Sequence, residues 1–260
     1  MRTSFSATDF PPRRRVSDKS KKHSAIDSVS RRSVLGGALL LAVATPLQAA
    51  GLAPTPRQAT GPFYPETLPL NADNDLVQVE GRSGRGAGDI LHLSGRVRGT
   101  MGNAIAGARV EIWQCDAHGR YHHAGDRRGG DAADPDFQGF GQTRTNAEGL
   151  YRFRTIVPVP YPGRTPHIHV NVSAPGRAPF VTQIYVRAHP LNARDVLFRR
   201  LGADAQERVA IDLTPATDIE PGARQGVFEI VLGDREKAHD RNEAPGPRVV
   251  RWLFGGTKKS

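Results

Sequence analysis

The chain has 260 residues, 38% of them hydrophobic and 24% charged, with a mean hydropathy of -0.46; this composition is typical of a globular protein and excludes a fibre or a wholly disordered chain. Its single cysteine, Cys115, excludes an internal disulfide framework and any multi-cysteine zinc or iron–sulfur site. The net charge of +10 is uneven, because residues 1–50 hold nine of the 36 Lys and Arg residues but three of the 26 Asp and Glu residues. The remainder is nearly balanced, which argues against a nucleic-acid partner.

The first elements in chain order are a polar lead and an apolar run. Arg31 and Arg32 precede the apolar residues 36–44 and a stretch of small residues. This order resembles a twin-arginine signal, which directs folded proteins to a translocon, so a cofactor could be loaded before export. We expect residues 1–49 to be the lead and signal, residues 50–260 to form the domain, and the protein to be periplasmic or extracellular. An uncleaved signal acting as a membrane anchor stays open, although the run is shorter than the roughly 20 residues of a comfortable span.

Short apolar or alternating segments, separated by Gly, Pro, Asn and Asp, follow from residue 76 onward. Such segments are typical of strands. The predicted strands are residues 76–80, 90–97, 108–115, 150–155, 167–172, 180–186, 209–213 and 226–232. Only residues 191–201 show a helical pattern. The prediction is an all-β chain with an antiparallel β-sandwich core, long loops and little helix.

His167 and His169 are two residues apart on a predicted strand, so their side chains point to the same face. Such a pair can hold a metal ion with two neutral imidazoles, although it can also be a half-buried polar face. Tyr121 and Tyr161 add to the metal hypothesis only if they ionise. Because a free phenol has a pKa of about 10, only a hard, highly charged cation such as ferric iron would remove its proton at neutral pH.

Five ordered motifs carry a resemblance to a known family. They are Ala108-Arg109-Val110-Glu111-Ile112-Trp113-Gln114, Gly119-Arg120-Tyr121, Asp134-Pro135-Asp136-Phe137-Gln138-Gly139, Pro160-Tyr161-Pro162 and Pro166-His167-Ile168-His169. Together they resemble the intradiol ring-cleavage dioxygenases, particularly the protocatechuate 3,4-dioxygenase branch. The similarity runs from Thr60 to at least Tyr185, which is more than half of the expected mature chain.

The resemblance implies a β-sandwich that holds non-haem Fe(III). Carried over residue by residue, the ligands would be Tyr121, Tyr161, His167 and His169, with a solvent hydroxide. Ferric iron with two tyrosinates and one hydroxide has no net charge, which suits a partly dry site. The expected activity is cleavage of a catechol-type aromatic 1,2-diol by O2 to a cis,cis-muconate-type diacid, with both oxygen atoms retained.

The resemblance also supplies candidates around the iron. The candidate catalytic residues are Arg164, Gln183 and Tyr161, and the candidate substrate-binding residues are Thr60, Gly61, Pro62, Tyr64 and Arg164. Arg164 would stabilise negative charge on the substrate, and Gln183 would lie near the iron pocket. Each has a plainer interpretation: a solvated loop charge for Arg164, a strand polar residue for Gln183, and terminal packing for the segment from Thr60 to Tyr64.

Two departures from the family pattern limit what can be carried over. Only five residues separate Tyr161 from His167, and Gly163 stands where the protocatechuate branch has an aromatic residue. We therefore expect a more open pocket. A helical N-terminal dimerisation segment like that of catechol 1,2-dioxygenases is not expected, so a homo-oligomer is possible but not specified, and the ring substituents of the substrate are open.

Two other functional classes remain as alternatives. A noncatalytic, prealbumin-like β-sandwich binding module would explain the hairpin pattern of residues 95–108 without any chemistry. A zinc or copper hydrolase or oxidase would use His167 and His169 with a third ligand such as His122 or His189. In the dioxygenase interpretation, His122 and its neighbour His123 lie at the pocket rim or in solvent, and Cys115 packs beside Trp113.

Overall fold

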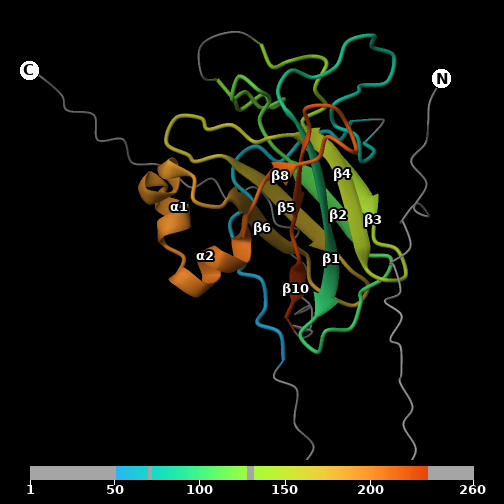
Figure 1. Cartoon of the computed structure of the whole chain (residues 1–260), viewed down its shortest axis with the longest axis vertical. Coiled ribbons are helices and arrows are strands. Elements are labelled where there is room, and N and C mark those ends of the chain that lie inside the picture. Colours follow the sequence, from blue (N-terminus) through green and yellow to red (C-terminus); the bar gives the residue numbers. More distant parts are fainter. Residues whose placement is uncertain (1–50, 70–71, 128–131, 234–260) are drawn as a thin grey trace, which may run out of the picture. The chain divides into compact units, whose positions relative to one another are not determined.

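The structure is a computed structural model that describes residues 51–69, 72–127 and 132–233 (Figure 1). The predicted lead and signal, residues 1–49, lie outside the described residues. In the described part of the chain, no helix is both long and apolar enough to cross a bilayer.

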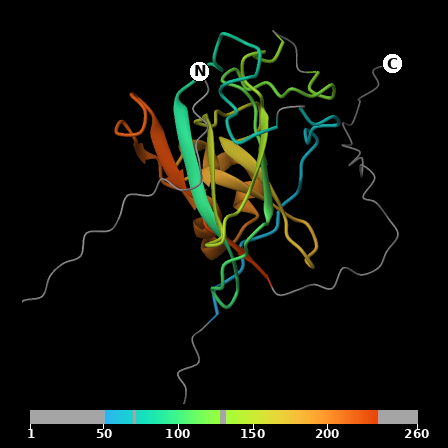
Figure 2. The ribbon, with the colours of Figure 1, turned by 90° about the vertical axis from the view of Figure 1, so that its right-hand side faces the viewer.

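The first sheet is built around β1, Ile90–Gly99. This strand pairs antiparallel with β4, Leu150–Ile156, and parallel with both β9, Arg224–Val227, and β10, Ile230–Leu232. The short β8, Thr214–Pro215, pairs antiparallel with β9. One long strand therefore organises this sheet, which Figure 2 shows beside the second one.

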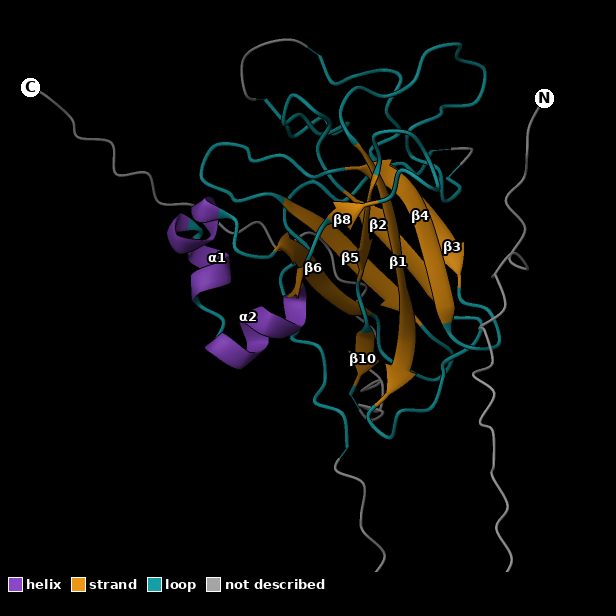
Figure 3. Ribbon diagram, in the orientation of Figure 1, coloured by secondary structure: helices purple, strands orange, loops and turns teal. Residues whose placement is uncertain are grey.

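The second sheet carries the candidate site. Its order is β3, Phe140–Arg144; β2, Arg109–Trp113; β5, His167–Ser173; β6, Phe180–Val186; and β7, Ala210–Ile211 (Figure 3). All neighbours are antiparallel except β6 and β7. The expected all-β class with little helix is confirmed, but the sheets are mixed rather than wholly antiparallel.

The alternation of side chains along β5 divides core from site. Ile168, Val170 and Val172 belong to the main hydrophobic core, which also takes in apolar side chains of β1, β2 and β4. Because neighbouring residues on a strand face opposite ways, His167 and His169 point to the other face of the sheet. The segment before residue 64 reaches that face, since a Cβ at Gly61 would come within 3.1 Å of His169 Cε1.

The helical prediction for residues 191–201 was too simple. The structure has a 3-10 helix η1, Pro190–Arg194, followed by α1, Val196–Arg199, and then α2, Ala203–Val209. Asp195 separates the first two because its backbone is extended and its side chain caps the start of α1.

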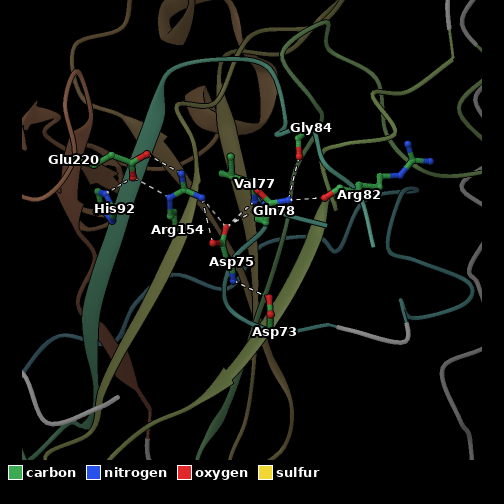
Figure 4. Close-up of polar contacts among 9 residues, drawn as sticks. All are labelled: Asp73, Asp75, Val77, Gln78, Arg82, Gly84, His92, Arg154 and Glu220. Atoms are coloured by element: carbon green, nitrogen blue, oxygen red, sulfur yellow. Dashed lines mark hydrogen bonds and ion pairs between the residues drawn. The ribbon is translucent and has the colours of Figure 1, made fainter. Parts of the chain in front are cut away.

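The predicted strand at residues 76–80 is wrong. Leu76 and Val77 are fully buried, but the Asp75 carboxylate accepts hydrogen bonds from the backbone N–H groups of Val77 and Gln78 and bends the chain there (Figure 4). An aspartate that bonds the backbone two residues ahead favours a turn over a strand. The same carboxylate pairs with Arg154 of β4, which also pairs with Glu220.

Strand β3 was not predicted, because its sequence from Phe140 to Arg144 has one large apolar residue and a glycine. Gly141 is nevertheless required there. A Cβ at this position would come within 2.4 Å of Leu76 Cδ1 and 2.7 Å of the Asp73 carbonyl oxygen. The buried turn at residues 73–77 therefore packs directly onto β3.

Candidate active site

Four candidate ligands meet at one end of the second sheet. His167 and His169 come from β5, Tyr121 from the loop after β2, and Tyr161 from the loop between β4 and β5. The ring centroids of the two histidines are 4.9 Å apart, those of Tyr161 and His167 are 5.5 Å apart, and those of the two tyrosines are 5.7 Å apart. Side chains that are up to 48 residues apart in sequence thus form one cluster.

His167 is 1% exposed, and its Nδ1 lies 2.7 Å from the Thr165 carbonyl oxygen. Since a carbonyl can only accept, Nδ1 carries the proton and Nε2 has a lone pair. Nε2 is buried and has no hydrogen-bond partner among the described residues. Burial, helped by the nearby Arg164 charge, lowers the pKa of His167 to about 3. The imidazole is therefore neutral and presents a free donor atom to a metal.

His169 is also 1% exposed, and its Nδ1 is buried without a hydrogen-bond partner in the described structure. Burial lowers its pKa well below the usual value, and electrostatic interactions with His167 and with the Arg164 charge act in the same direction. Trp113, which is the cross-strand partner of His169, stacks on its ring with centroids 4.8 Å apart and an interplanar angle of 8°. The indole thus fixes the plane of the second imidazole.

Both tyrosines are shielded from water. Burial raises the pKa of Tyr121 well above its usual value, and the neighbouring Tyr161 adds to the effect. Burial also raises the pKa of Tyr161, although the Arg164 charge beside it acts in the opposite direction. Phe63 stacks on Tyr121 with a centroid distance of 4.6 Å. Without a cation both phenols stay protonated, so a phenolate here needs a strong positive partner.

This donor set fits Fe(III). Each of two neutral imidazoles offers a nitrogen that no described group hydrogen-bonds, and two adjacent phenols can supply the negative charge that ferric iron requires. Among the described residues, no group of three or more His, Cys, Asp and Glu side chains gathers in a metal-binding arrangement. The further oxygen donors near the two histidines are therefore the tyrosines.

The two residues suggested as a third ligand of a zinc or copper site, His122 and His189, make other contacts in the described structure. The Nδ1 of His189 accepts a hydrogen bond from Leu191 N at 3.3 Å and caps η1. His122 is exposed and borders Gly139, while His123 is partly buried and lies 3.7 Å from Glu66. Cys115 packs in the same cluster as Trp113 and Tyr121, and its Sγ lies 3.7 Å from the Val159 carbonyl.

Arg164 and Gln183 lie at the cluster and are joined to each other. The Arg164 Nη2 donates to Gln183 Oε1 at 2.6 Å, and the Gln183 Nε2 donates to the Ala59 carbonyl at 3.0 Å. Arg164 Nε donates to Asp195 Oδ2 at 2.8 Å. The guanidinium is thus held inside the fold rather than solvated on a loop, and Gln183 holds it from one side.

The substrate-binding candidates before β1 divide into two groups. Gly61 lies next to His169, since a Cβ at Gly61 would come within 3.1 Å of His169 Cε1; Pro62 is exposed and Thr60 half-buried. Tyr64 instead turns toward Trp113, at a ring-centroid distance of 5.0 Å, and its hydroxyl lies 3.3 Å from the buried Glu111. Gly61 is thus at the site, whereas Tyr64 supports the indole beneath it.

A cavity of about 470 Å³ adjoins Tyr121. Phe63, Trp113 and Tyr121 form its wall toward the ligand cluster. Its other lining residues are Pro65, Thr67, Leu68, Pro69, Val79, His122, Pro135, Phe137, Gln138, Gly139 and Phe140. Its described lining is mainly apolar, as expected for a small aromatic ligand.

Several groups at the site were missed in the sequence analysis. Asp195, the ligand-stacking Trp113 and the aromatic Phe63 were not given functional roles, and Tyr185, whose hydroxyl donates to Gln58 Oε1 at 2.8 Å, was not singled out. For Trp113 a signal was present, because it directly precedes Gln114 in one of the recognised motifs. For Asp195 there was none, since it stands outside them.

Comparisons with known proteins agree with this geometry. A family model described as Dioxygenase matches residues 59–234. The chain is 36% identical over 173 residues to the protocatechuate 3,4-dioxygenase beta chain of Burkholderia cepacia, covering 63% of this chain and 73% of that protein. It is 33% identical over 162 residues to catechol 1,2-dioxygenase 2 of Acinetobacter lwoffii, covering 55% of each. The match thus spans about half of that catechol enzyme.

Solved structures show the same fold. The dioxygenase domain of a dioxygenase carbohydrate-binding protein fusion from Streptomyces sp. SirexAA-E is 32% identical, with a TM-score of 0.55 over 70% of this chain and 99% of that one. The intradiol ring-cleavage dioxygenase from Tetranychus urticae has a TM-score of 0.56 at 23% identity, over 72% and 98% of the two chains. The family match covers most of the described residues, including all four candidate ligands. The chain therefore belongs to the intradiol ring-cleavage dioxygenase family.

Proposed function

We propose that the protein is a non-haem Fe(III) dioxygenase that cleaves a catechol-type aromatic 1,2-diol with O2 to a cis,cis-muconate-type diacid. The observation that carries the proposal is the meeting of a buried phenol, Tyr121, and a partly buried phenol, Tyr161, with two neutral imidazoles, each of which has a buried nitrogen without a hydrogen-bond partner among the described residues. Ferric iron held there would bind both oxygens of the diol and activate it toward O2 as a Lewis acid. A noncatalytic binding module has no need for this arrangement.

The residues of this chain would divide the remaining work. His167 and His169 stay neutral and are oriented by Thr165 and Trp113, so they bind without losing a proton. Tyr121 and Tyr161 give up their phenolic protons and balance the metal charge. Arg164, fixed at two nitrogens, offers positive charge to an anionic diol and to negative charge that develops on its ring.

The proposal is tested by metal analysis and a visible spectrum of the purified chain, before and after anaerobic addition of catechol. We expect near-stoichiometric iron, a tyrosinate-to-iron absorption band that shifts with catechol, and a ring-opened diacid that carries two labelled atoms from ¹⁸O2. A colourless chain that stays iron-free after iron loading would overturn the proposal.

Two variants assign the ligands. We expect His167→Ala to lose iron and activity together, and Tyr161→Phe to change the visible band and slow turnover. His118→Ala is the matched control, because His118 is an exposed histidine that is not one of the four candidate ligands. Full iron and turnover in His167→Ala would contradict its role, as would an unchanged spectrum in Tyr161→Phe.

We also propose that the protein is exported by the twin-arginine route and acts in the periplasm or outside the cell. The support is the sequence around Arg31 and Arg32 and the apolar run that follows. Export of the folded chain would let iron be bound before translocation. Its substrate would then be an aromatic diol met outside the cytoplasm, and a panel of catechols with different ring substituents would identify it.

A further inference from the structure

Asp195 is a buried carboxylate outside both sheets, in the connection between η1 and α1. Asp195 is 1% exposed, and its two carboxylate oxygens accept four hydrogen bonds. Oδ1 accepts from the backbone N–H groups of Leu197 and Phe198, both at 2.9 Å. Oδ2 accepts from Arg164 Nε at 2.8 Å and from Thr165 N at 3.0 Å. One oxygen therefore caps α1, and the other faces the site.

Both donors to Oδ2 belong to the short loop between Tyr161 and His167. The Thr165 carbonyl accepts the hydrogen bond from His167 Nδ1, so the orientation of this carbonyl determines which nitrogen of His167 is free. The Thr165 hydroxyl donates to Asn192 Oδ1 at 2.7 Å. Two side chains of the η1–α1 segment, Asn192 and Asp195, thus bind this loop. Through Thr165 they are connected to His167, a candidate metal ligand.

Arg164 is fixed from both sides by the same arrangement. Gln183 accepts from Nη2 and Asp195 accepts from Nε, so the plane of the guanidinium is set by two fixed acceptors. A buried arginine also needs a compensating charge, because an unpaired buried ion is strongly unfavourable. Asp195 supplies that charge at the Nε of the guanidinium.

We propose that Asp195 is a positioning residue, which orients Arg164 for the substrate and His167 for the metal at the same time. The inference rests on the proposed function for the meaning of that orientation. Asp195 does not touch the substrate. It acts through Arg164 and through the backbone of Thr165. Because the carboxylate has two oxygens with separate tasks, the capping task and the positioning task can be separated by substitution.

The decisive variant is Asp195→Asn. The amide oxygen can still cap α1, since Asn and Asp are equally good N-caps. The amide NH2 then faces two N–H donors, those of Arg164 and Thr165, and cannot accept from either. We expect kcat/KM to fall by about 10²-fold, mainly through kcat, because small displacements of positioned groups have effects of that size. A mere capping residue would tolerate this change with activity like that of the parent chain.

A double-mutant cycle shows whether the effect passes through Arg164. In an Arg164→Gln background, the Asp195→Asn change should reduce kcat/KM by clearly less than in the parent chain, since coupled residues are non-additive and only the effect through Thr165 and His167 then remains. Equal losses in both backgrounds would overturn the proposed route. The control is Asp212→Asn, which removes an exposed carboxylate 3.2 Å from Arg187 and should leave turnover unchanged.

The second readout needs neither iron nor turnover. In NMR spectra of the iron-free chain labelled with ¹⁵N-histidine, we expect the His167 Nδ1 proton to exchange slowly with water. Asp195→Asn should change the chemical shift of this proton and speed its exchange. An unaltered resonance would contradict the effect on His167. If a thermal unfolding measurement shows that the Asp195→Asn variant is not folded, Asp195→Ser replaces it. Serine also caps helices, but its side chain is too short to reach Arg164. If the parent chain takes up iron but cleaves no diol, the proposed function is wrong. The NMR measurement on His167 would still show whether Asp195 is a positioning residue.

Discussion

His167 and His169 are two residues apart on one strand, yet different neighbours fix them. His167 is oriented through its Nδ1 by the Thr165 carbonyl, and His169 by stacking on Trp113. Gly61 lies beside His169 with a φ of +76°, a conformation that side chains with a Cβ rarely adopt. At the scale of single residues, the site therefore depends on groups that do not themselves bind a metal.

The Gly61→Ala variant tests this dependence. We expect it to lose about 1 kcal/mol of stability from backbone strain, and to lose iron and activity because its Cβ would lie 3.1 Å from His169 Cε1. Gly176→Ala is the matched control, since Gly176 has a φ of +68° but open space around its Cα. Urea denaturation and iron content distinguish the two: both variants should be destabilised, and only Gly61→Ala should lose iron. Full iron in Gly61→Ala would refute the steric argument.

At the scale of elements, one arginine of β4 joins three segments of the chain. Arg154 Nη1 pairs with Asp75 at 3.2 Å, Arg154 Nη2 pairs with Glu220 at 2.7 Å, and His92 of β1 lies 3.2 Å from Glu220 (Figure 4). This cluster attaches the turn at residues 73–78 and the turn after β8 to the first sheet. The turn carries Leu76, which packs against β3. The ion pair between Arg154 and Asp75 therefore helps to keep Leu76 in the hydrophobic core.

Glu220 gives this cluster a pH dependence. The hydrogen bond from Arg154 lowers the pKa of Glu220, an effect that the nearby His92 supports. A carboxyl whose pKa is lower in the folded state stabilises the fold above its unfolded pKa of about 4.3 and loses that contribution as the pH falls through the folded value. Urea denaturation from pH 7 to pH 3 should therefore show a steeper loss of stability for the parent than for Glu220→Gln. Glu229→Gln, which alters the exposed pair with Arg98, should keep the slope of the parent.

At the scale of the whole molecule, the four candidate ligands and the residues that orient them all lie between Ala59 and Asp195. The segment before β1 is part of this arrangement, because Thr55 N donates to Val231 O and the Gln183 amide donates to Ala59 O. The residues from Thr55 to Tyr64 are therefore part of the site's architecture, whereas we predict from the sequence alone that the site does not need residues 1–49.

A truncation pair and an export assay test this division. A chain that begins at Gly51 should have the same unfolding stability, iron content and turnover as the full chain. A chain that begins after Tyr64 should lose iron because Gly61 and Phe63 are missing. Replacing both Arg31 and Arg32 by Lys should keep the protein in the cytoplasm with its iron bound, as measured by cell fractionation. Undiminished export of that variant would argue against the twin-arginine route.

The local sequence was enough to predict most of the strands and to name the four candidate ligands. Their spacing on a predicted strand was enough to predict that His167 and His169 share a face, because side-chain direction alternates along a strand. The turn at Asp75 and the strand at Gly141 could not be predicted this way, since a side-chain hydrogen bond overrides an apolar pattern in one case and packing requires a glycine in the other.

The sequence by itself determined the fold class, the family and the residue types at the site, because these follow from local periodicity and from ordered motifs. The tertiary structure alone decided what orients them. Asp195 is 28 residues beyond His167 in the chain and lies outside every motif, yet it reaches the loop that carries Arg164 and Thr165. Trp113 meets His169 only through the register of β2 against β5. Such contacts depend on how distant segments pack, and no local pattern encodes that.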